Sequence, residues 1–227
     1  MQAVKEFYSK LQFPGQYTIE DLDFYTDDVV NDSLKIFDDT AQHATRVLDV
    51  GCGSGFIVNF LANRYPNITF DAVDFSDSID FARQFSSDHD IKNINYYKEH
   101  FLLWQTNHKY DLIISNGVLH HIPKYQSAVD KIYKLATGTL VIGIYNSYGK
   151  ILKKICKINY INETLYLDQE QCPFEVSFSD KQFKELFTEY DVLTVHPSCC
   201  NRLVDFYNLF NSGNGGLTMY VLQQKIC

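Results

Sequence analysis

The sequence predicts an α/β fold with a doubly wound, mostly parallel sheet and an N-terminal helical cap. Its 227 residues fit a single domain. From Arg46 onward, short apolar runs alternate with amphipathic stretches, which is typical of βα units and a parallel sheet. A loop with glycines at three alternate positions follows the first apolar run. This pattern is expected where a strand leads into a helix beside a ligand.

The composition narrows the function classes. The chain has 28 Asp and Glu against 20 Lys and Arg, a formal net charge of −8, which argues against broad electrostatic capture of nucleic acid or anionic membrane. Nine acidic and three basic residues fall in 1–45, so an acidic cap would disfavour anionic substrates on its side. The sequence has no long apolar run and no signal peptide, which predicts a cytoplasmic protein. Its cysteines lack the spacing of metal ligands, which predicts free thiols and no metal site.

Residues 1–45 are expected to form the helical cap. Thr18 offers an N-cap hydroxyl with the carboxylate of Asp21 three residues later. Apolar residues then recur at helical intervals, including Leu34 and Phe37. We assign 46–145 to a cofactor-binding core, and 146–227 to a lid insert followed by C-terminal strands.

The remaining elements follow from apolar runs, amphipathic stretches and turn residues. Strands are expected at 46–50, 68–73, 93–97, 110–115, 139–145, 191–196 and 217–223. Helices are expected near 55–64, 77–87, 124–136, 180–189 and 201–210. Ser179 would open the helix at 180–189, and the segment 146–178 has no regular pattern.

The loop after the first strand predicts a nucleotide site. Gly51, Gly53 and Gly55 let the backbone approach a ligand, and the following helix N-terminus presents free N–H groups. The dinucleotide-binding fingerprint needs a glycine where Phe56 stands, so a nicotinamide enzyme fits poorly. Asp49, just before the loop, disfavours a pyrophosphate and suits a cationic ligand.

A second carboxylate ends the second predicted strand. Asp74 lies 23 residues after Gly51, where a carboxylate can accept both hydroxyls of an adenosine ribose. The alternative interpretation is that Asp74 caps the helix that follows Ser76.

These residues resemble the class I S-adenosylmethionine-dependent methyltransferases. The segment Val47–Gly55 matches the first motif of that family almost letter for letter, and Asp74 matches its second acidic position. The segment Asp111–Ile122 resembles its fourth-strand motif, so the resemblance covers about 46–145. It implies S-adenosyl-L-methionine as the cofactor and a seven-stranded Rossmann-like sheet with an antiparallel final strand at 217–223.

The resemblance also implies which residues surround the cofactor. The three glycines would approach it by backbone, Asp49 would face the methionine amino end, and Phe75 would touch the adenine. The full set of expected contacts is Asp49, Gly51, Cys52, Gly53, Gly55, Asp74, Phe75, His100, Phe101 and Asn116. At His100 the family often has an Asp that holds the adenine amino group. A neutral His could accept that hydrogen bond, or Glu99 could take the role in a shifted register.

Methyl transfer from a sulfonium needs alignment more than acid or base chemistry. Proximity and orientation can supply on the order of 7–11 kcal/mol. Candidate catalytic residues are His120 and His121 after the fourth strand and Tyr145 at the end of the fifth. The alternatives are that the histidines pack under or orient the next helix, and that Tyr145 only shapes the exit of its strand.

The sequence predicts methyl transfer to O or N of a small-molecule acceptor. Asn116–Leu119 lacks the Asn-Pro-Pro-aromatic sequence of adenine or glutamine amino-group methylation, and no Pro-Cys dipeptide offers the nucleophile of cytosine C5 methylation. Two alternatives stay open. One is an RNA methyltransferase that docks phosphate on the four lysines within Lys150–Lys157, and the other is a non-catalytic cofactor-binding regulatory module. The sequence does not indicate the oligomeric state.

Overall fold

The computed structural model describes residues 2–10, 15–23, 32–145, 172–196 and 217–225. The predicted helix at 201–210 and the lysines of Lys150–Lys157 lie outside the described residues. Within these described ranges, no helix has both the length and the apolar character needed to cross a bilayer. The two described cysteines, Cys52 and Cys172, are free thiols.

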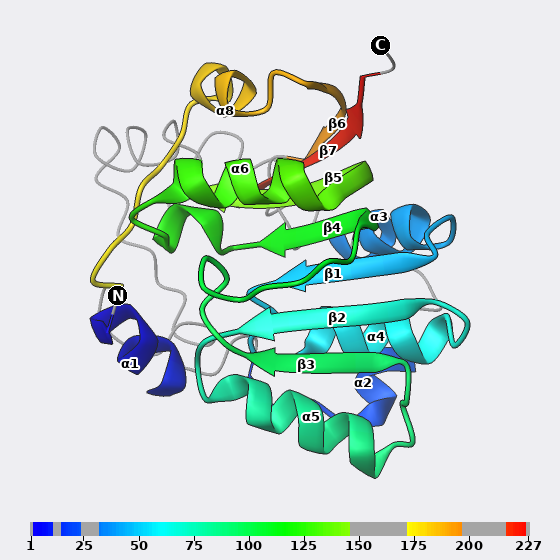
Figure 1. Ribbon diagram of the computed structural model, residues 1–227. Coiled ribbons are helices and arrows are strands. Elements are labelled where there is room, and N and C mark those ends of the chain that lie inside the picture. Colours follow the sequence, from blue (N-terminus) through cyan, green and yellow to red (C-terminus); the bar gives the residue numbers. More distant parts are fainter. Residues whose placement is uncertain (1, 11–14, 24–31, 146–171, 197–216, 226–227) are drawn as a thin grey trace.

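A seven-stranded sheet forms the centre of the molecule (Figure 1). Its order is β3-β2-β1-β4-β5-β7-β6, and β7 runs antiparallel to both of its neighbours. This confirms the doubly wound, mostly parallel sheet, and each predicted strand agrees with the structure to within three residues. The strands are β1 (Arg46–Val50), β2 (Thr69–Asp74), β3 (Ile94–Lys98), β4 (Tyr110–Asn116), β5 (Ala136–Tyr145), β6 (Tyr190–His196) and β7 (Leu217–Gln224).

Helices cover both faces of the sheet (Figure 1). One face packs against α3 (Asp32–Ala41), α4 (Phe56–Arg64) and α5 (Ser78–Asp88). The other packs against α6 (Tyr125–Leu135) and α8 (Asp180–Leu186). The cap contributes α1 (Gln2–Lys10) and α2 (Ile19–Asp23), and a 3-10 turn, η2 (Leu119–His121), follows β4.

Local sequence explains where two of these helices begin. The Thr18 backbone N–H and hydroxyl both donate to the Asp21 carboxylate at the start of α2. Ser179 and Gln182 form a capping box at the start of α8, as the Ser179 position predicted. The prediction extended α8 to residue 189, but the helix ends at Leu186. The chain turns there and buries Phe187 with its ring centroid 4.9 Å from that of Phe183.

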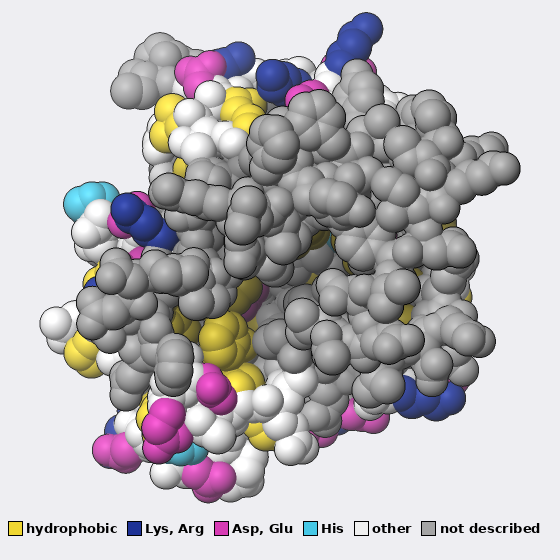
Figure 2. Space-filling view, turned by 180° about the vertical axis from the view of Figure 1, so that it is seen from behind, with side chains coloured by type: hydrophobic (Ala, Val, Ile, Leu, Met, Phe, Trp, Pro, Cys, Tyr) yellow, Lys and Arg dark blue, Asp and Glu magenta, His cyan; other side chains and the backbone are white. Residues whose placement is uncertain are grey.

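Residues of each strand alternate between two hydrophobic cores. Leu48, Ile113 and Leu140 point to the α6 face, whereas Val47 and Leu112 point to the α4 face. A sheet covered on both sides needs apolar residues in nearly every strand position, which is why the strands read as continuous apolar runs. Viewed from behind, the molecule has a hollow with hydrophobic side chains on its visible floor and acidic side chains along its lower margin (Figure 2).

A buried carboxylate joins four strands. The fully buried Asp71 on β2 accepts hydrogen bonds from Arg46 at 2.8 Å, from Tyr110 at 2.7 Å and from Asn95 at 2.8 Å. Burial on its own raises the pKa of Asp71, but the bonds from Tyr110, Arg46 and Asn95 outweigh it, so the pKa lies below its usual value. The folded protein therefore favours the charged form of Asp71.

We predict that Asp71→Asn lowers the free energy of unfolding at pH 7 by about 2–4 kcal/mol, because Arg46 and Tyr110 lose a charged partner. Since the folded pKa is depressed, the contribution of Asp71 is present above the unfolded pKa of about 3.9 and is lost as pH falls through the folded pKa. Urea denaturation of both proteins between pH 3 and 7 checks this. A variant as stable as the wild type at pH 7 contradicts it.

Candidate functional site

A cavity of about 280 Å³ opens at the carboxyl ends of β1, β2 and β4. The strand order reverses between β1 and β4, and ligands of doubly wound sheets bind at this switch point. Helix α1 lies off the same strand ends (Figure 1) and contributes Val4 and Tyr8 to the lining.

Most of the residues predicted for the site come together around this cavity. Its lining includes Asp49, Gly51, Cys52, Gly53, Asp74, Phe75, His100, Phe101, Asn116 and His121. Glu99 also lines it, as do apolar side chains such as Phe37, Val118 and Ile122. Gly55, His120 and Tyr145 are not part of the described lining.

The glycines of the loop are held in left-handed backbone. The φ angles of Gly51, Gly53 and Gly55 are +77°, +56° and +81°. A Cβ on Gly51 would lie 2.3 Å from Val118 Cγ2, and one on Gly55 would lie 2.5 Å from the Cβ of Ala82 in α5. Gly55 thus allows α4 and α5 to pack closely. Contact of Gly55 with a cofactor stays a prediction.

A partly buried hydrogen-bond chain supports the glycine loop. The Tyr17 hydroxyl donates to the Ser54 carbonyl at 2.9 Å and accepts from the Asn59 amide at 2.8 Å. Ser86 donates to Asn59 Oδ1 at 2.6 Å. The chain links the loop to α4 and α5 and fixes the direction of the Ser54 peptide.

Asp49 is a buried carboxylate that faces the cavity. It is 3% exposed, and no residue in the described part of the chain donates a hydrogen bond to it. Burial, and secondarily the charge of Asp74, raises the pKa of Asp49 to about 7. A buried charge without a partner is costly, so this position would attract a cation.

Asp74 is also buried, but it is hydrogen-bonded. Its Oδ1 accepts from the Ser76 backbone N–H at 2.7 Å and the Ser76 hydroxyl at 2.6 Å, and its Oδ2 accepts from the Gly53 N–H at 2.9 Å. Burial raises its pKa, although these bonds lower it. The N-cap of α5 is Asp77, so the alternative reading of Asp74 as the cap of this helix is wrong. Asp74 instead ties the β2 turn to the glycine loop.

His100 lines the cavity, and its Nε2 is the ring nitrogen that can donate a hydrogen bond. Its Nδ1 accepts from the Leu102 backbone N–H at 3.1 Å, so the proton of the neutral ring resides on Nε2. Burial lowers the pKa of His100, although the neighbouring Glu99 carboxylate raises it. Glu99 is exposed on the cavity rim and accepts from the His100 backbone N–H at 2.7 Å. Glu99 is an acceptor here, and His100 Nε2 is a donor.

The histidines after β4 lie in different surroundings. His121 contacts Tyr8 of α1, with 2.7 Å between the Tyr8 hydroxyl and Nε2, and its Nδ1 is 2.9 Å from the Phe174 carbonyl. His120 is fully buried, and its ring centroid lies 4.0 Å from that of Tyr145. The catalytic roles of His120 and Tyr145 stay predictions. Sequence reasoning missed Tyr8, because nothing in α1 resembles a motif.

Comparison with known proteins agrees with this geometry. Residues 41–192 match the family model described as a methyltransferase domain. Malonyl-[acyl-carrier protein] O-methyltransferase 2 of Ilyobacter polytropus is 29% identical over 121 residues, 52% of this chain and 45% of that protein. Trans-aconitate 2-methyltransferase of Mycobacterium tuberculosis is 27% identical over 101 residues, 44% and 36% of the two chains. The chain thus spans less than half the length of these two relatives.

Solved structures share the fold at low sequence identity. Magnesium protoporphyrin IX methyltransferase from Synechocystis PCC 6803 with bound S-adenosylhomocysteine is similar with a TM-score of 0.65 and 15% identity, over 99% of each chain. The N-methyltransferase NodS of Bradyrhizobium japonicum WM9 has a TM-score of 0.58 and 15% identity, over 85% of this chain and 84% of that one. With more than half of its residues matched by the family model, the chain belongs to the class I S-adenosylmethionine-dependent methyltransferase family.

Proposed function

We propose that the cavity binds S-adenosylmethionine and that the protein transfers its methyl group to O or N of a small-molecule acceptor. The observation that carries this proposal is the buried carboxylate of Asp49 at the switch point of the sheet, which has no hydrogen-bond donor among the described residues. A cationic ligand would relieve the unfavourable burial of this charge, and the methionine end of the cofactor carries an ammonium group.

Asp74 is suited to the ribose of the cofactor. A carboxylate offers about four acceptor positions, and three of those on Asp74 are used by Gly53 and Ser76. The position left on Oδ2 can accept one ribose hydroxyl. The second would displace the Ser76 hydroxyl from Oδ1, while the Gly53 and Ser76 backbone bonds keep the carboxylate oriented.

Glu99 and His100 are suited to the adenine edge in complementary roles. The adenine amino group is a donor and needs an acceptor, which Glu99 offers and the Nε2–H of His100 does not. His100 Nε2 can instead donate to an adenine ring nitrogen. Phe75 and the buried Phe101 provide apolar contact surface beside them.

The cofactor, when bound, supplies a methyl group on a sulfonium, which is an excellent leaving group. The protein then has to hold the acceptor in line and exclude water. The apolar lining from Val4, Val118 and Ile122 would exclude water, and His121 and Tyr8 lie where polar groups of an acceptor could be held.

Isothermal calorimetry with S-adenosylhomocysteine and S-adenosylmethionine tests the proposal. We expect the wild type to bind both, and Asp74→Ala to weaken binding by roughly tenfold to a hundredfold, since hydrogen bonds to a charged group contribute about 1.5–3 kcal/mol. Asp77→Ala is the matched control, because Asp77 is largely exposed, three residues away, and pairs with Lys98. A wild type that binds neither ligand overturns the proposal.

We predict that Asp49→Asn stabilises the empty protein above pH 7 while weakening S-adenosylmethionine binding. The folded pKa of about 7 exceeds the unfolded value of about 3.9. The folded state therefore holds a proton that the unfolded state loses, and wild-type stability falls as pH rises from about 4 to 7. Asn mimics the protonated form, so the variant lacks this decline. Urea denaturation of the ligand-free proteins at several pH values measures it.

Asp71→Asn is expected to change the free energy of unfolding in the opposite direction, so it serves as the comparison. Asp71 has partners inside the protein, whereas Asp49 has none among the described residues. If Asp49→Asn destabilises the empty protein at pH 8 as Asp71→Asn does, Asp49 has a structural role and its assignment to the cofactor is wrong.

We predict that the wild type prefers S-adenosylhomocysteine to S-inosylhomocysteine, in which a carbonyl oxygen replaces the adenine amino group. The carbonyl would face the Glu99 carboxylate without a proton between them. Glu99→Gln should reduce the preference by about tenfold, because Gln can either accept or donate. Glu185→Gln is the matched control, because it makes the same change at an exposed glutamate of α8 that is not part of the described cavity lining. Equal preference in wild type and Glu99→Gln shows that Glu99 does not contact the adenine amino group.

A further inference from the structure

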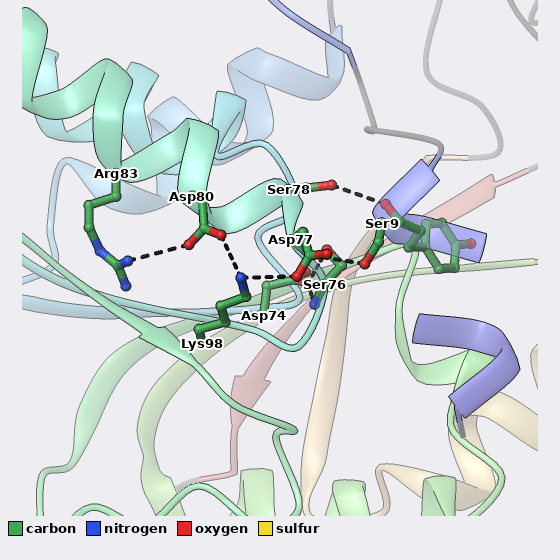
Figure 3. Close-up of polar contacts among 9 residues, drawn as sticks. Ser9, Asp74, Ser76, Asp77, Ser78, Asp80, Arg83 and Lys98 are labelled. Carbon is green, nitrogen blue, oxygen red and sulfur yellow. Dashed lines mark hydrogen bonds and ion pairs between the residues drawn. The ribbon is translucent and has the colours of Figure 1, made fainter. Parts of the chain in front are cut away.

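Helix α1 brings a tyrosine to the cavity, with its hydroxyl beside His121. Tyr8 lines the cavity, and its hydroxyl oxygen lies 2.7 Å from His121 Nε2. Two contacts with the start of α5 hold the helix there. The Ser78 hydroxyl donates to the Tyr8 carbonyl at 3.1 Å, and the Asp77 N–H donates to Ser9 Oγ at 3.1 Å (Figure 3). Lys98, paired with Asp77 and Asp80, braces this end of α5.

The hydrogen bonds of His121 fix which of its nitrogens carries the proton. Nδ1 lies 2.9 Å from the Phe174 carbonyl, which can only accept, so Nδ1 is the donor. In the neutral ring, Nε2 then has a lone pair and Tyr8 donates to it. Burial raises the pKa of Tyr8 far above its ordinary value, so the phenol stays protonated.

An imidazole Nε2 has one lone pair in the plane of the ring, and Tyr8 uses it. Any acceptor that gives a proton to His121 must take the position of the Tyr8 hydroxyl. A carboxylate has no proton to give at neutral pH. The described lining contains the acidic side chains of Asp49, Asp74 and Glu99, whose negative charge disfavours an anionic acceptor. The site is therefore suited to a neutral group with an O–H bond.

We propose that His121 is a catalytic residue that takes the proton of an acceptor hydroxyl, and that the Tyr8 hydroxyl occupies the position of that hydroxyl in the empty protein. This inference rests on the proposed function and narrows its acceptor to an alcohol or phenol. The Phe174 carbonyl keeps His121 in the tautomer that the proton transfer needs.

The transfer step balances with these groups. The acceptor oxygen forms a bond to the methyl carbon as the carbon–sulfur bond breaks and its electron pair stays on sulfur. The hydroxyl proton passes to His121 Nε2. A neutral ether, a neutral thioether and an imidazolium result, and the imidazolium proton returns to water.

Chemical complementation tests the proposal with para-cresol, which is the tyrosine side chain as a free molecule. Tyr8→Ala should leave a hole of that shape beside His121 and bind para-cresol roughly tenfold or more tightly than the wild type, since burial of the ring is restored. With S-adenosylmethionine present, we expect the variant to produce para-methylanisole, detected by mass spectrometry. Tyr8→Phe is the matched control, because it fills the hole and offers no hydroxyl.

Each result decides between the proposal and an alternative. The proposal is overturned if Tyr8→Ala binds S-adenosylhomocysteine like the wild type but neither binds nor methylates para-cresol. Equal methylation by Tyr8→Ala and by the double variant Tyr8→Ala with His121→Gln rules out His121 as the base. Faster methylation of para-toluidine, the matching amine, rejects the hydroxyl assignment. If the wild type does not bind S-adenosylhomocysteine, the proposed function itself is wrong, and this result is distinct from a failure of the His121 proposal alone.

A spectroscopic readout is independent of turnover and of the variants' stability. Long-range ¹H–¹⁵N correlation spectra of the wild type with ¹⁵N-labelled histidine report which ring nitrogen of His121 is protonated. We expect protonated Nδ1 and unprotonated Nε2, both in the free protein and with S-adenosylhomocysteine. A His121 ring protonated on Nε2 and not on Nδ1 contradicts the proposal.

Discussion

The pairing of β1 with β4 is the constraint from which the site follows. Val47, Leu48 and Asp49 pair in parallel with Leu112, Ile113 and Ile114, although more than 60 residues separate them in the chain. The chain leaves β1 toward α4 on one face and leaves β4 toward η2 and α6 on the other. The two connections diverge and open a crevice at the carboxyl ends of both strands. Asp49, Asn116 and the glycine loop meet there because of this divergence.

Two buried aspartates on neighbouring strands show how one residue type acquires different roles. Asp71 accepts hydrogen bonds from four residues inside the protein, so it stabilises the fold in its charged form. Asp49 has none in the described part of the chain, and its burial favours the protonated form until a cation arrives. The free energy lost by isolating Asp49 is available to a ligand that supplies the missing charge. Stability and affinity are therefore in conflict at this position.

The sequence predicted the sheet well because each strand is a short apolar run bounded by turn residues. Ten of the site residues that it predicted line the cavity, because the glycine loop, Asp74 and the His100–Phe101 segment follow strand ends. It could not predict the partners of these groups. The approach of Gly55 to Ala82, the tautomers of His100 and His121, and the position of Tyr8 all depend on contacts between segments far apart in the chain. Hydrophobic periodicity and local residue spacing do not predict such contacts.

Tyr8 and Tyr17 both precede the 41–192 region that defines the family match, yet one contacts His121 and the other holds the Ser54 carbonyl. The residues matched by the family model and the residues that line the cavity or support its glycine loop therefore have different boundaries. A core grafted onto the N-terminal segment of a relative would keep its sheet but lose both tyrosine contacts. An exchange of the 41–192 region between such proteins would therefore preserve the Tyr8–His121 and Tyr17–Ser54 contacts only where the N-terminal segment is exchanged with it.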